Sequence, residues 1–283
     1  MTIESIHTQI LARIRRSGTS EGLNLVAYSG GVDSTLTAHL VYTIFPENTL
    51  AMIGISASMP ELQLSRARHL AEHIGLPLRE LKTAEGRLTG YVENTGSSCY
   101  HCKMTLYETM QNFSKALVDE LRTRAGRVVL FNGTNADDLS DPTRVGLKAA
   151  REYEVSSPLS ELTKQEVRAL SHHVGLPNWN YAASPCLRSR LQYGVQATPE
   201  NLARIEAAEE IVRAICGLDD QDNLRVRHLE NRIACIEVDE RLLTRVSAVF
   251  SDIRTRLIEK GYNDVLLRQF HSGSLSFLAP MPA

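Results

Sequence analysis

Residues 29–34 (SGGVDS) form the segment best suited to bind phosphate, because they lie between an apolar run and a helical pattern. Two glycines allow the backbone to turn tightly and to come close to an anion. At the start of a helix, free backbone N–H groups and the helix dipole attract phosphate oxygens, and serine hydroxyls add donors. We therefore predict a phosphate-binding loop made of the residues Ser29, Gly30, Gly31, Asp33 and Ser34.

Other nucleotide motifs do not describe this segment. A Walker loop needs G-x-x-x-x-G-K-[ST], and the dinucleotide fingerprint needs G-x-G-x-x-G. A glycine pair alone would fit a simple turn, but Ser-Gly-Gly-x-Asp-Ser after a first strand resembles the PP-loop of the N-type ATP pyrophosphatases. This resemblance implies that ATP is cleaved to AMP and pyrophosphate with Mg²⁺, and it makes Asp33 a candidate magnesium ligand.

A second polar segment, residues 135–138 (NADD), follows the fourth apolar run. In a parallel sheet, ligands bind at the carboxyl ends of the strands, so this segment is expected to face the same cleft as the phosphate loop. Asp137 and Asp138 are therefore candidate nucleotide or Mg²⁺ ligands. A polar loop with a helix cap is the alternative, and the sequence leaves both open.

Three of the five cysteines lie in polar segments: Cys99 and Cys102 form a C-x-x-C, and Cys186 lies in residues 182–190 (AASPCLRSR). Zinc is weakly supported, because a second C-x-x-C or a histidine pair is missing. A redox pair at a helix N-terminus and a structural pair are both possible. With Cys186, the three thiolates could instead hold a [4Fe–4S] cluster with one open iron. The spacing of the cysteines leaves the choice open.

The two remaining cysteines are expected to be structural, and two arginines are expected to influence Cys186. Cys216 and Cys235 lie in apolar segments, where a cysteine commonly behaves as a small buried hydrophobe. Arg188 and Arg190 lie close to Cys186 in the chain, and their positive charges favour its thiolate form.

The elements that must position these residues alternate along the first two thirds of the chain. Such alternation predicts an α/β fold with a parallel sheet wound on both faces. The last third predicts a smaller α+β domain, so we expect domains at residues 1–193 and 194–283. The predicted strands are 24–28, 50–56, 78–82, 128–132, 224–229, 233–238 and 265–269, and the predicted helices include 34–44, 60–74, 103–124 and 240–260.

Composition limits the function classes. The chain has 283 residues, is 43% hydrophobic and 23% charged, and carries a formal net charge of −2. This charge argues against a protein held on nucleic acid by bulk positive charge. Because we find neither a long apolar run nor a signal peptide, we expect no membrane attachment and a cytoplasmic location, where the cysteines should be reduced.

Taken together, the motifs resemble the LarE family of ATP-dependent sulfur transferases. The family's substrate is a pyridinium mononucleotide whose two carboxylates are adenylated and then converted to thiocarboxylates. The resemblance implies that Cys186 bears sulfur, and the C-x-x-C points to the branch in which Cys99, Cys102 and Cys186 ligate a [4Fe–4S] cluster. The resembling segments are 29–34, 132–139 (NGTNADDL), 146–152 (GLKAARE), 157–159, 162–175, 183–190, 224–228 (LRVRH) and 271–274.

Further expectations follow from this resemblance. Arg225 and Arg227 lie two apart on one predicted strand and so face the same side, where they would bind the substrate's phosphate; an exposed strand face is the alternative. A sulfide donor and a homo-oligomer are also expected. Two other functions stay open: a PP-loop tRNA thiolase, and a non-catalytic module that senses ATP or redox state.

Overall fold

The computed structural model describes residues 2–121, 127–141 and 144–271. The described chain forms two compact units that interleave along the sequence. The first comprises Met1–Ser56, Glu61–Glu85 and Cys99–Asn180, and the second comprises Ala57–Pro60, Gly86–Ser98 and Tyr181–Ala283. The boundary expected between residues 193 and 194 stays a prediction. Two expectations, the helix end at Arg124 and the motif residues Ser272–Ser274, lie outside the described residues.

The first unit is built on a parallel sheet of four strands in the order β3-β2-β1-β4. Its central strand, β1, pairs in parallel with both β2 and β4. Such strands are mostly apolar because both faces are covered by helices, and four of the five residues of β1 are buried, Asn24 among them. The strands are β1 (Leu23–Ala27), β2 (Thr49–Ile55), β3 (Leu78–Lys82) and β4 (Val128–Phe131).

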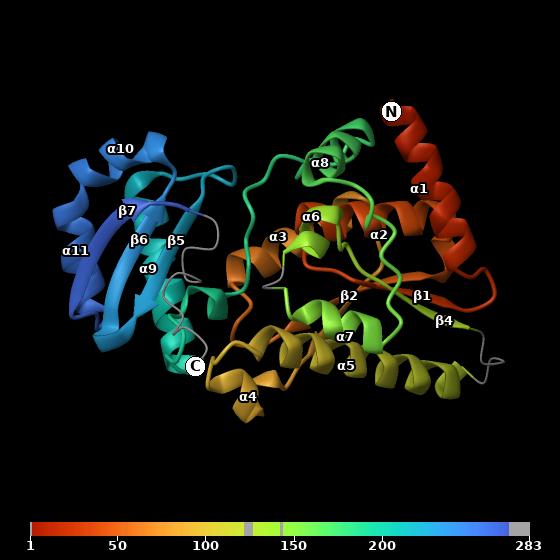
Figure 1. Ribbon diagram of the computed structural model, residues 1–283, viewed down its shortest axis with the longest axis horizontal. Helices are drawn as coiled ribbons and strands as arrows, with labels where there is room; N and C mark the ends of the chain where they lie inside the picture. The colour runs from red at the N-terminus through yellow and green to blue at the C-terminus, as the bar shows by residue number, and fades with distance from the viewer. Residues whose placement is uncertain (1, 122–126, 142–143, 272–283) are drawn as a thin grey trace. The chain divides into compact units, whose positions relative to one another are not determined.

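Helices cover both faces of this sheet, which confirms the predicted α/β fold (Figure 1). On one face, α2 packs against α1 and α8. On the other face, α5 and α7 enclose a core that includes Tyr107, Met110 and Ala149. The helices of this unit are α1 (Ile3–Ser17), α2 (Val32–Ile44), α3 (Glu61–His73), α5 (Ser98–Leu121), α6 (Ala136–Ser140), α7 (Gly146–Glu152) and α8 (Lys164–His173).

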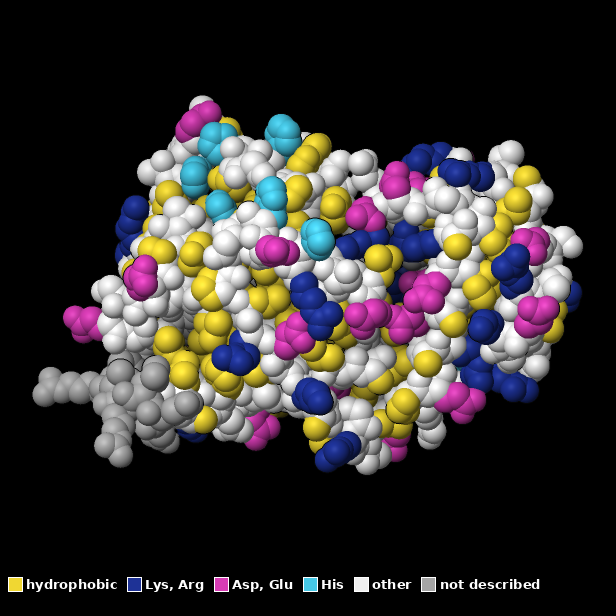
Figure 2. All heavy atoms as spheres, turned by 180° about the vertical axis from the view of Figure 1, so that it is seen from behind, with side chains coloured by type: hydrophobic (Ala, Val, Ile, Leu, Met, Phe, Trp, Pro, Cys, Tyr) yellow, Lys and Arg dark blue, Asp and Glu magenta, His cyan; other side chains and the backbone are white. Residues whose placement is uncertain are grey.

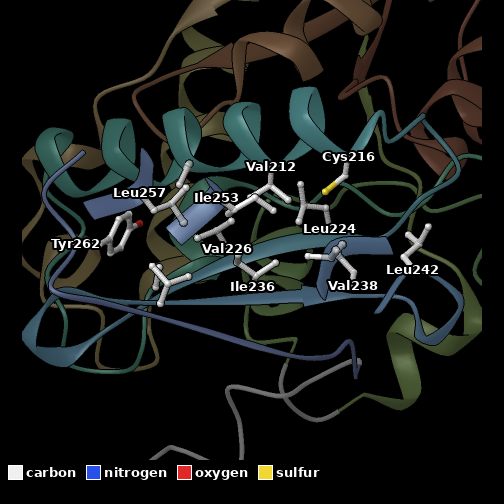
Figure 3. Close-up of a cluster of buried hydrophobic side chains, with 14 residues drawn as sticks. Val212, Cys216, Leu224, Val226, Ile236, Val238, Leu242, Ile253, Leu257 and Tyr262 are labelled. Carbon is white, nitrogen blue, oxygen red and sulfur yellow. The ribbon is translucent and has the colours of Figure 1, made fainter. Parts of the chain in front are cut away.

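The second unit contains a three-stranded sheet in the order β5-β6-β7. Strand β5 (Leu224–Leu229) pairs antiparallel with β6 (Ile233–Val238), and β7 (Asp264–Gln269) pairs with β6 in parallel. Helices α9 (Pro199–Cys216), α10 (Leu243–Ala248) and α11 (Phe250–Glu259) bury the apolar core that Figure 3 shows. Cys216 is part of this core, and Cys235 is also buried. Their expected structural role is therefore supported by their burial.

Two predicted helices differ from the observed ones. The single helix predicted over 240–260 is wrong, because the chain breaks into α10 and α11 at Val249, whose φ is −115°. The apolar pattern hides this break, since Val246 and Ile253 are both buried in the same core. Helix α5 begins at Ser98, before the predicted start, so that Cys99 and Cys102 lie inside its first turns.

Several histidines gather on the surface of the first unit, as the cyan side chains in Figure 2 show. The rings of His7 in α1 and His173 at the end of α8 meet edge to face at 5.5 Å. Burial lowers the pKa of His7, and the nearby His173 lowers it further. Burial also lowers the pKa of His39 in α2, with His7 as a second cause. The packing of α1, α2 and α8 therefore favours neutral imidazoles.

This packing predicts that the free energy of unfolding decreases as the pH falls below 6.5, the ordinary pKa of these histidines. The unfolded chain binds more protons than the folded chain in that window, so protonation favours unfolding. Thermal unfolding measured between pH 5 and pH 8 checks this. His7→Gln should flatten the dependence, whereas His69→Gln, an exposed position in α3, should leave it unchanged. Equal slopes for both variants would contradict the account.

Candidate functional site

The phosphate loop connects β1 to α2, and its shape depends on glycine. Gly30 has a φ of +70°, a conformation that residues with a side chain rarely adopt. A Cβ atom on Gly30 would lie 2.8 Å from both Cα and Cβ of Ala67 in α3. Gly31 precedes α2 without a side-chain cap, so the N–H groups of the first turn are positioned to donate to a phosphate.

Two serines close this loop. Ser29 N–H donates to Ser34 Oγ at 3.1 Å, and the two hydroxyl oxygens are 3.0 Å apart. The hydroxyl of Ser34 also donates to the carbonyl of Gly31 at 3.1 Å. Ser34 is buried and Ser29 is exposed. Ser34 therefore shapes the loop from inside, while the Ser29 hydroxyl is accessible to a ligand.

Two buried amides hold the loop from behind. The side-chain amide of Gln63 donates to the carbonyl of Ser29. Asn178 donates to the carbonyl of Gly30 at 3.1 Å and to Thr35 Oγ1 at 3.1 Å. These bonds occupy the loop carbonyls and so orient the peptide planes. Sequence reasoning missed both amides, because each lies far along the chain and belongs to no local motif.

Asp33, in the first turn of α2, is the electrostatic centre of this site. Its carboxylate accepts a hydrogen bond from Asn135 at 3.0 Å and forms an ion pair with Lys164. The backbone N–H of Lys164 donates to Asp137 at 3.0 Å. The structure thus brings Asp33 and Asp137 together around one lysine. The side chain of Lys164 is one-third exposed.

Lys164 is a functional candidate that sequence reasoning missed. The sequence shows it only as part of the capping box Thr163–Glu166, which the structure confirms at the start of α8. Its position after the cap was the available signal, because a side chain in the first turn of a helix lies beside the same helix end that attracts anions. In a Walker loop the lysine is local, whereas here it is supplied by a helix that is distant in sequence.

The segment after β4 is packed onto the phosphate loop. A Cβ atom on Gly133 would lie 2.6 Å from the carbonyl carbon of Asp33 and 2.7 Å from Ser34 N. Asp138 forms a capping box with Asn135 at the start of α6 and an ion pair with Arg144 at 2.8 Å. Asp138 therefore has the capping role that was the alternative, while its part in nucleotide binding stays a prediction.

The C-x-x-C lies at the start of α5, one of the helices that cover the face of the parallel sheet opposite to α2. Cys99 and Cys102 are half-buried and three residues apart, which places them on one side of the helix. The motif 146–152 packs here: a Cβ atom on Gly146 would lie 3.3 Å from the carbonyl oxygen of Cys99. Tyr100 donates a hydrogen bond to Glu152 at 2.8 Å. Helix α7 thus fixes the start of α5.

Cys186 belongs to the second unit and is also half-buried. It immediately precedes a short 3₁₀ helix, Leu187–Arg190. Within the described residues, no group of three or more His, Cys, Asp or Glu side chains is arranged to hold a metal ion. The pair Cys99 and Cys102 has the spacing of cluster ligands, and the role of Cys186 as a further ligand stays a prediction.

Arg225 and Arg227 are buried, with 4% and 6% exposure, so the exposed strand face considered as their alternative is wrong. Arg225 donates to the carbonyls of Ala183 and of Leu224. Arg227 donates to the carbonyl of Ser189 at 2.8 Å and pairs with Glu237 at 2.8 Å. Both side chains reach the segment around Cys186, as expected for residues two apart on one strand.

Arg225 is the more unusual of these arginines. Burial lowers its pKa to about 9, and the positive charge of Arg190 is the second cause. Its guanidinium lies over the ring of Phe270 at 5.4 Å and, among the described residues, hydrogen-bonds to no carboxylate. The charge of Glu209 acts in the opposite direction but does not restore the ordinary pKa. Because burial of a cation is costly, an anionic ligand at Arg225 would stabilise this part of the protein further.

The fold and the loop together define the class. A parallel sheet with helices on both faces, and a Ser-Gly-Gly-x-Asp-Ser loop after its central strand, is the α/β fold of PP-loop proteins. A comparison with models of known protein families finds no match. No helix within the described residues is long and apolar enough to cross a membrane.

Three relatives place the chain more closely. An uncharacterized protein of Synechocystis sp. is 38% identical, with 76% of this chain and 75% of the relative covered. The pyridinium-3,5-bisthiocarboxylic acid mononucleotide synthase of Lactiplantibacillus plantarum is 30% identical, with 89% and 88% covered. A subunit of the glutamine-hydrolyzing GMP synthase of Sulfurisphaera tokodaii is 24% identical, with 58% and 46% covered. The chain belongs to the LarE family.

The contact between Gly133 and the phosphate loop predicts the effect of one added methyl group. Gly133→Ala would press a Cβ atom against the backbone of Asp33, which should destabilise the fold by about 1–3 kcal/mol and weaken nucleotide binding. Gly86→Ala is the control, because a Cβ atom there meets nothing within 4 Å. Urea unfolding and ATP titration check this, and wild-type values for Gly133→Ala would contradict the described geometry.

Proposed function

We propose that this protein is an ATP-dependent sulfur transferase that converts the carboxylates of a pyridinium-3,5-biscarboxylate mononucleotide into thiocarboxylates. The observation that carries the proposal is the start of α2. It follows the Ser29–Gly31 turn without a side-chain cap, and Lys164 forms an ion pair with Asp33 in its first turn. The name of the relative from Lactiplantibacillus plantarum supports the product, a pyridinium mononucleotide with two thiocarboxylate groups. The likeness to GMP synthases supports the PP-loop class, for which the motif Ser29–Ser34 implies the use of ATP.

The first step would activate the substrate. A carboxylate oxygen attacks the α-phosphorus of ATP, the bond to the β-phosphate oxygen breaks, and pyrophosphate leaves with that electron pair. The N–H groups at the start of α2 and the Ser29 hydroxyl would hold the phosphates. Lys164 would turn from Asp33 to the phosphates, where charge neutralisation is the main catalytic contribution.

The residues around the loop fit a magnesium–nucleotide complex. Mg²⁺ keeps several waters and is usually bound by one or two carboxylates together with substrate phosphates. The side chain of Asp33 is one-quarter exposed, and Asp137 accepts the backbone N–H of Lys164. Asp33 would therefore hold Mg²⁺ once the ammonium group of Lys164 moves to the phosphates, with Asp137 and Asp138 as further candidates.

The substrate's own phosphate would bind at Arg225 and Arg227. Planar guanidinium groups bind phosphate oxygens through two parallel hydrogen bonds. Arg225 supports this assignment best, because its hydrogen bonds go to carbonyl oxygens and no carboxylate hydrogen-bonds to it within the described residues. Glu209 is the nearby carboxylate whose charge raises the pKa of Arg225, and a phosphate would add further negative charge at this buried position.

In the second step, sulfide attacks the activated acyl carbon, the bond to the AMP oxygen breaks, and AMP and the thiocarboxylate are formed with release of one proton. Cys99, Cys102 and Cys186 would hold a [4Fe–4S] cluster. When bound, such a cluster supplies sulfide through its open iron. The external sulfide donor and a homo-oligomeric state stay predictions from the family.

Lys164→Met should reduce pyrophosphate release about a hundredfold, the usual effect of removing one group that stabilises transition-state charge. The substitution also leaves the Asp33 carboxylate without its ion-pair partner. Lys115→Met, at an exposed position in α5, is the control. A steady-state pyrophosphate assay measures both. Full activity of Lys164→Met would show that this lysine takes no part in nucleotide chemistry.

Alanine variants of Cys99, Cys102 and Cys186 should each abolish thiocarboxylate formation while ATP binding survives, because the three thiolates act as one ligand set. Cys216→Ala, in the core of the second unit, should thiolate normally. Mass spectrometry of the mononucleotide gives the readout. Full activity of Cys99→Ala together with loss of activity in Cys186→Ala would contradict the cluster. A loss of H₂S from the Cys186 peptide would then indicate that Cys186 gives up its own sulfur to the substrate.

A further inference from the structure

The backbone around Cys186 is held by three arginines through its carbonyl oxygens. Arg225 donates to Ala183, Arg190 donates to Pro185 and Cys186, and Arg227 donates to Ser189. This segment contains no strand and only one turn of 3₁₀ helix, so its carbonyls lack the regular partners of a helix or sheet. The guanidinium groups take the place of those partners.

Arg190 is the centre of this arrangement. It is 1% exposed, and its Nη1 lies 3.1 Å from the carbonyl oxygen of Cys186. The same oxygen accepts the Ser189 hydroxyl at 2.7 Å and the Ser189 N–H at 3.0 Å. A peptide group with three donors on one oxygen has little freedom to rotate, so the Cα–Cβ bond of Cys186 is held in one direction.

Glu209 fixes Arg190 in turn. Its two carboxylate oxygens accept Arg190 Nε at 2.9 Å and Nη2 at 3.2 Å. One of these oxygens also accepts the N–H of Val226 at 3.0 Å. Burial would raise the pKa of Glu209, but the charges of Arg190 and Arg225 lower it overall. Glu209 is therefore an anion that connects α9 and β5 to the Cys186 segment.

The edge of the sheet explains why this connection is available. Strand β5 lies at one edge of the order β5-β6-β7, so within the described part of the chain its outer N–H and carbonyl groups have no neighbouring strand. The side chain of Glu209 accepts one of these N–H groups, from Val226. The N–H of Gln192 donates to the carbonyl of His228. The segment that follows Cys186 is thus attached to strand β5. Regular elements such as strands hold a reactive group more accurately than loops do.

We propose that the Arg190–Glu209 pair is a positioning device that holds the Cys186 thiol in the orientation needed for sulfur transfer. The proposal rests on the proposed function of Cys186 as a residue of the sulfur-transfer site. Arg190 touches the peptide of Cys186 and acts through it. Lysine is a poor replacement, because one ammonium group lacks the planar fork that spans the two oxygens of Glu209 and the two carbonyls.

Arg190→Lys and Glu209→Gln test the device, with Arg204→Lys as the matched control. Arg204 also lies in the second unit, donates to the carbonyl of Lys260 and pairs with Glu200, but it does not contact the Cys186 segment. Two quantities are measured for each variant: the single-turnover rate of thiolation, and the rate of iodoacetamide alkylation of each cysteine, resolved by peptide mass spectrometry. Alkylation of the buried Cys216 and Cys235 reports global unfolding.

We expect the two rates to change in opposite directions. Thiolation should fall about a hundredfold in Arg190→Lys and Glu209→Gln, the effect of a misplaced reacting group. Alkylation of Cys186 should rise several-fold as its segment loosens, while Cys216 and Cys235 stay protected. Arg204→Lys should match the wild type in both rates. Unchanged alkylation of Cys186 in both Arg190→Lys and Glu209→Gln would overturn the proposal.

The design separates this inference from the proposed function. If the wild type forms no thiocarboxylate, the proposed function fails, and the alkylation rates still decide whether Arg190 and Glu209 hold Cys186. If Cys216 becomes reactive in both variants, Ser189→Ala decides instead. It removes only the hydroxyl that donates to the Cys186 carbonyl, and it should raise Cys186 alkylation and slow thiolation. Wild-type behaviour of a folded Ser189→Ala would overturn the proposal in that case.

Discussion

The turn at Ser29–Gly31 is the constraint on which the first unit depends. The chain must leave the central strand and start α2 with its N–H groups facing outward, and Gly30 at a φ of +70° permits this. The backbone also has to lie within contact of Ala67 and Gly133. Gln63 and Asn178 then bind the loop carbonyls, and Lys164 balances the charge of Asp33. Much of the unit therefore serves to expose a few donors in one direction, as anion binding at a helix start requires.

The second unit solves a different problem, which is to hold an irregular segment without the hydrogen bonds of a helix or sheet. Buried guanidinium groups serve this purpose because each offers several donors in a fixed plane. Their burial is costly, and Glu209 and Glu237 offset part of the cost as paired carboxylates. Arg225 keeps a lowered pKa of about 9, with burial as the main cause. In the proposed function, an anionic substrate would add negative charge at this position, and the arginines that hold the loop would also bind the substrate.

Local patterns were sufficient to predict most elements and the parallel α/β fold. Strands β3, β5 and β6 begin and end at the predicted residues. In β5 the signal was the alternation of apolar residues with basic and polar ones, which is typical of a strand. The capping box at Thr163 was also visible, since its residues are three apart. In contrast, Lys164 and Asn178 reach the phosphate loop from positions more than a hundred residues away. Their partners are set by tertiary packing, which no local pattern encodes, and the break at Val249 is hidden because its flanking residues share one core.

The central claim is that this member of the LarE family uses ATP to activate a mononucleotide carboxylate for sulfur transfer. The most direct test is pyrophosphate release by anaerobically purified protein, with ATP, Mg²⁺ and sulfide. The pyridinium-3,5-biscarboxylate mononucleotide and bulk tRNA are compared as substrates. The account predicts release that depends on the mononucleotide alone, with sulfur appearing in that molecule. Release that depends on tRNA alone, or on neither substrate, would contradict it.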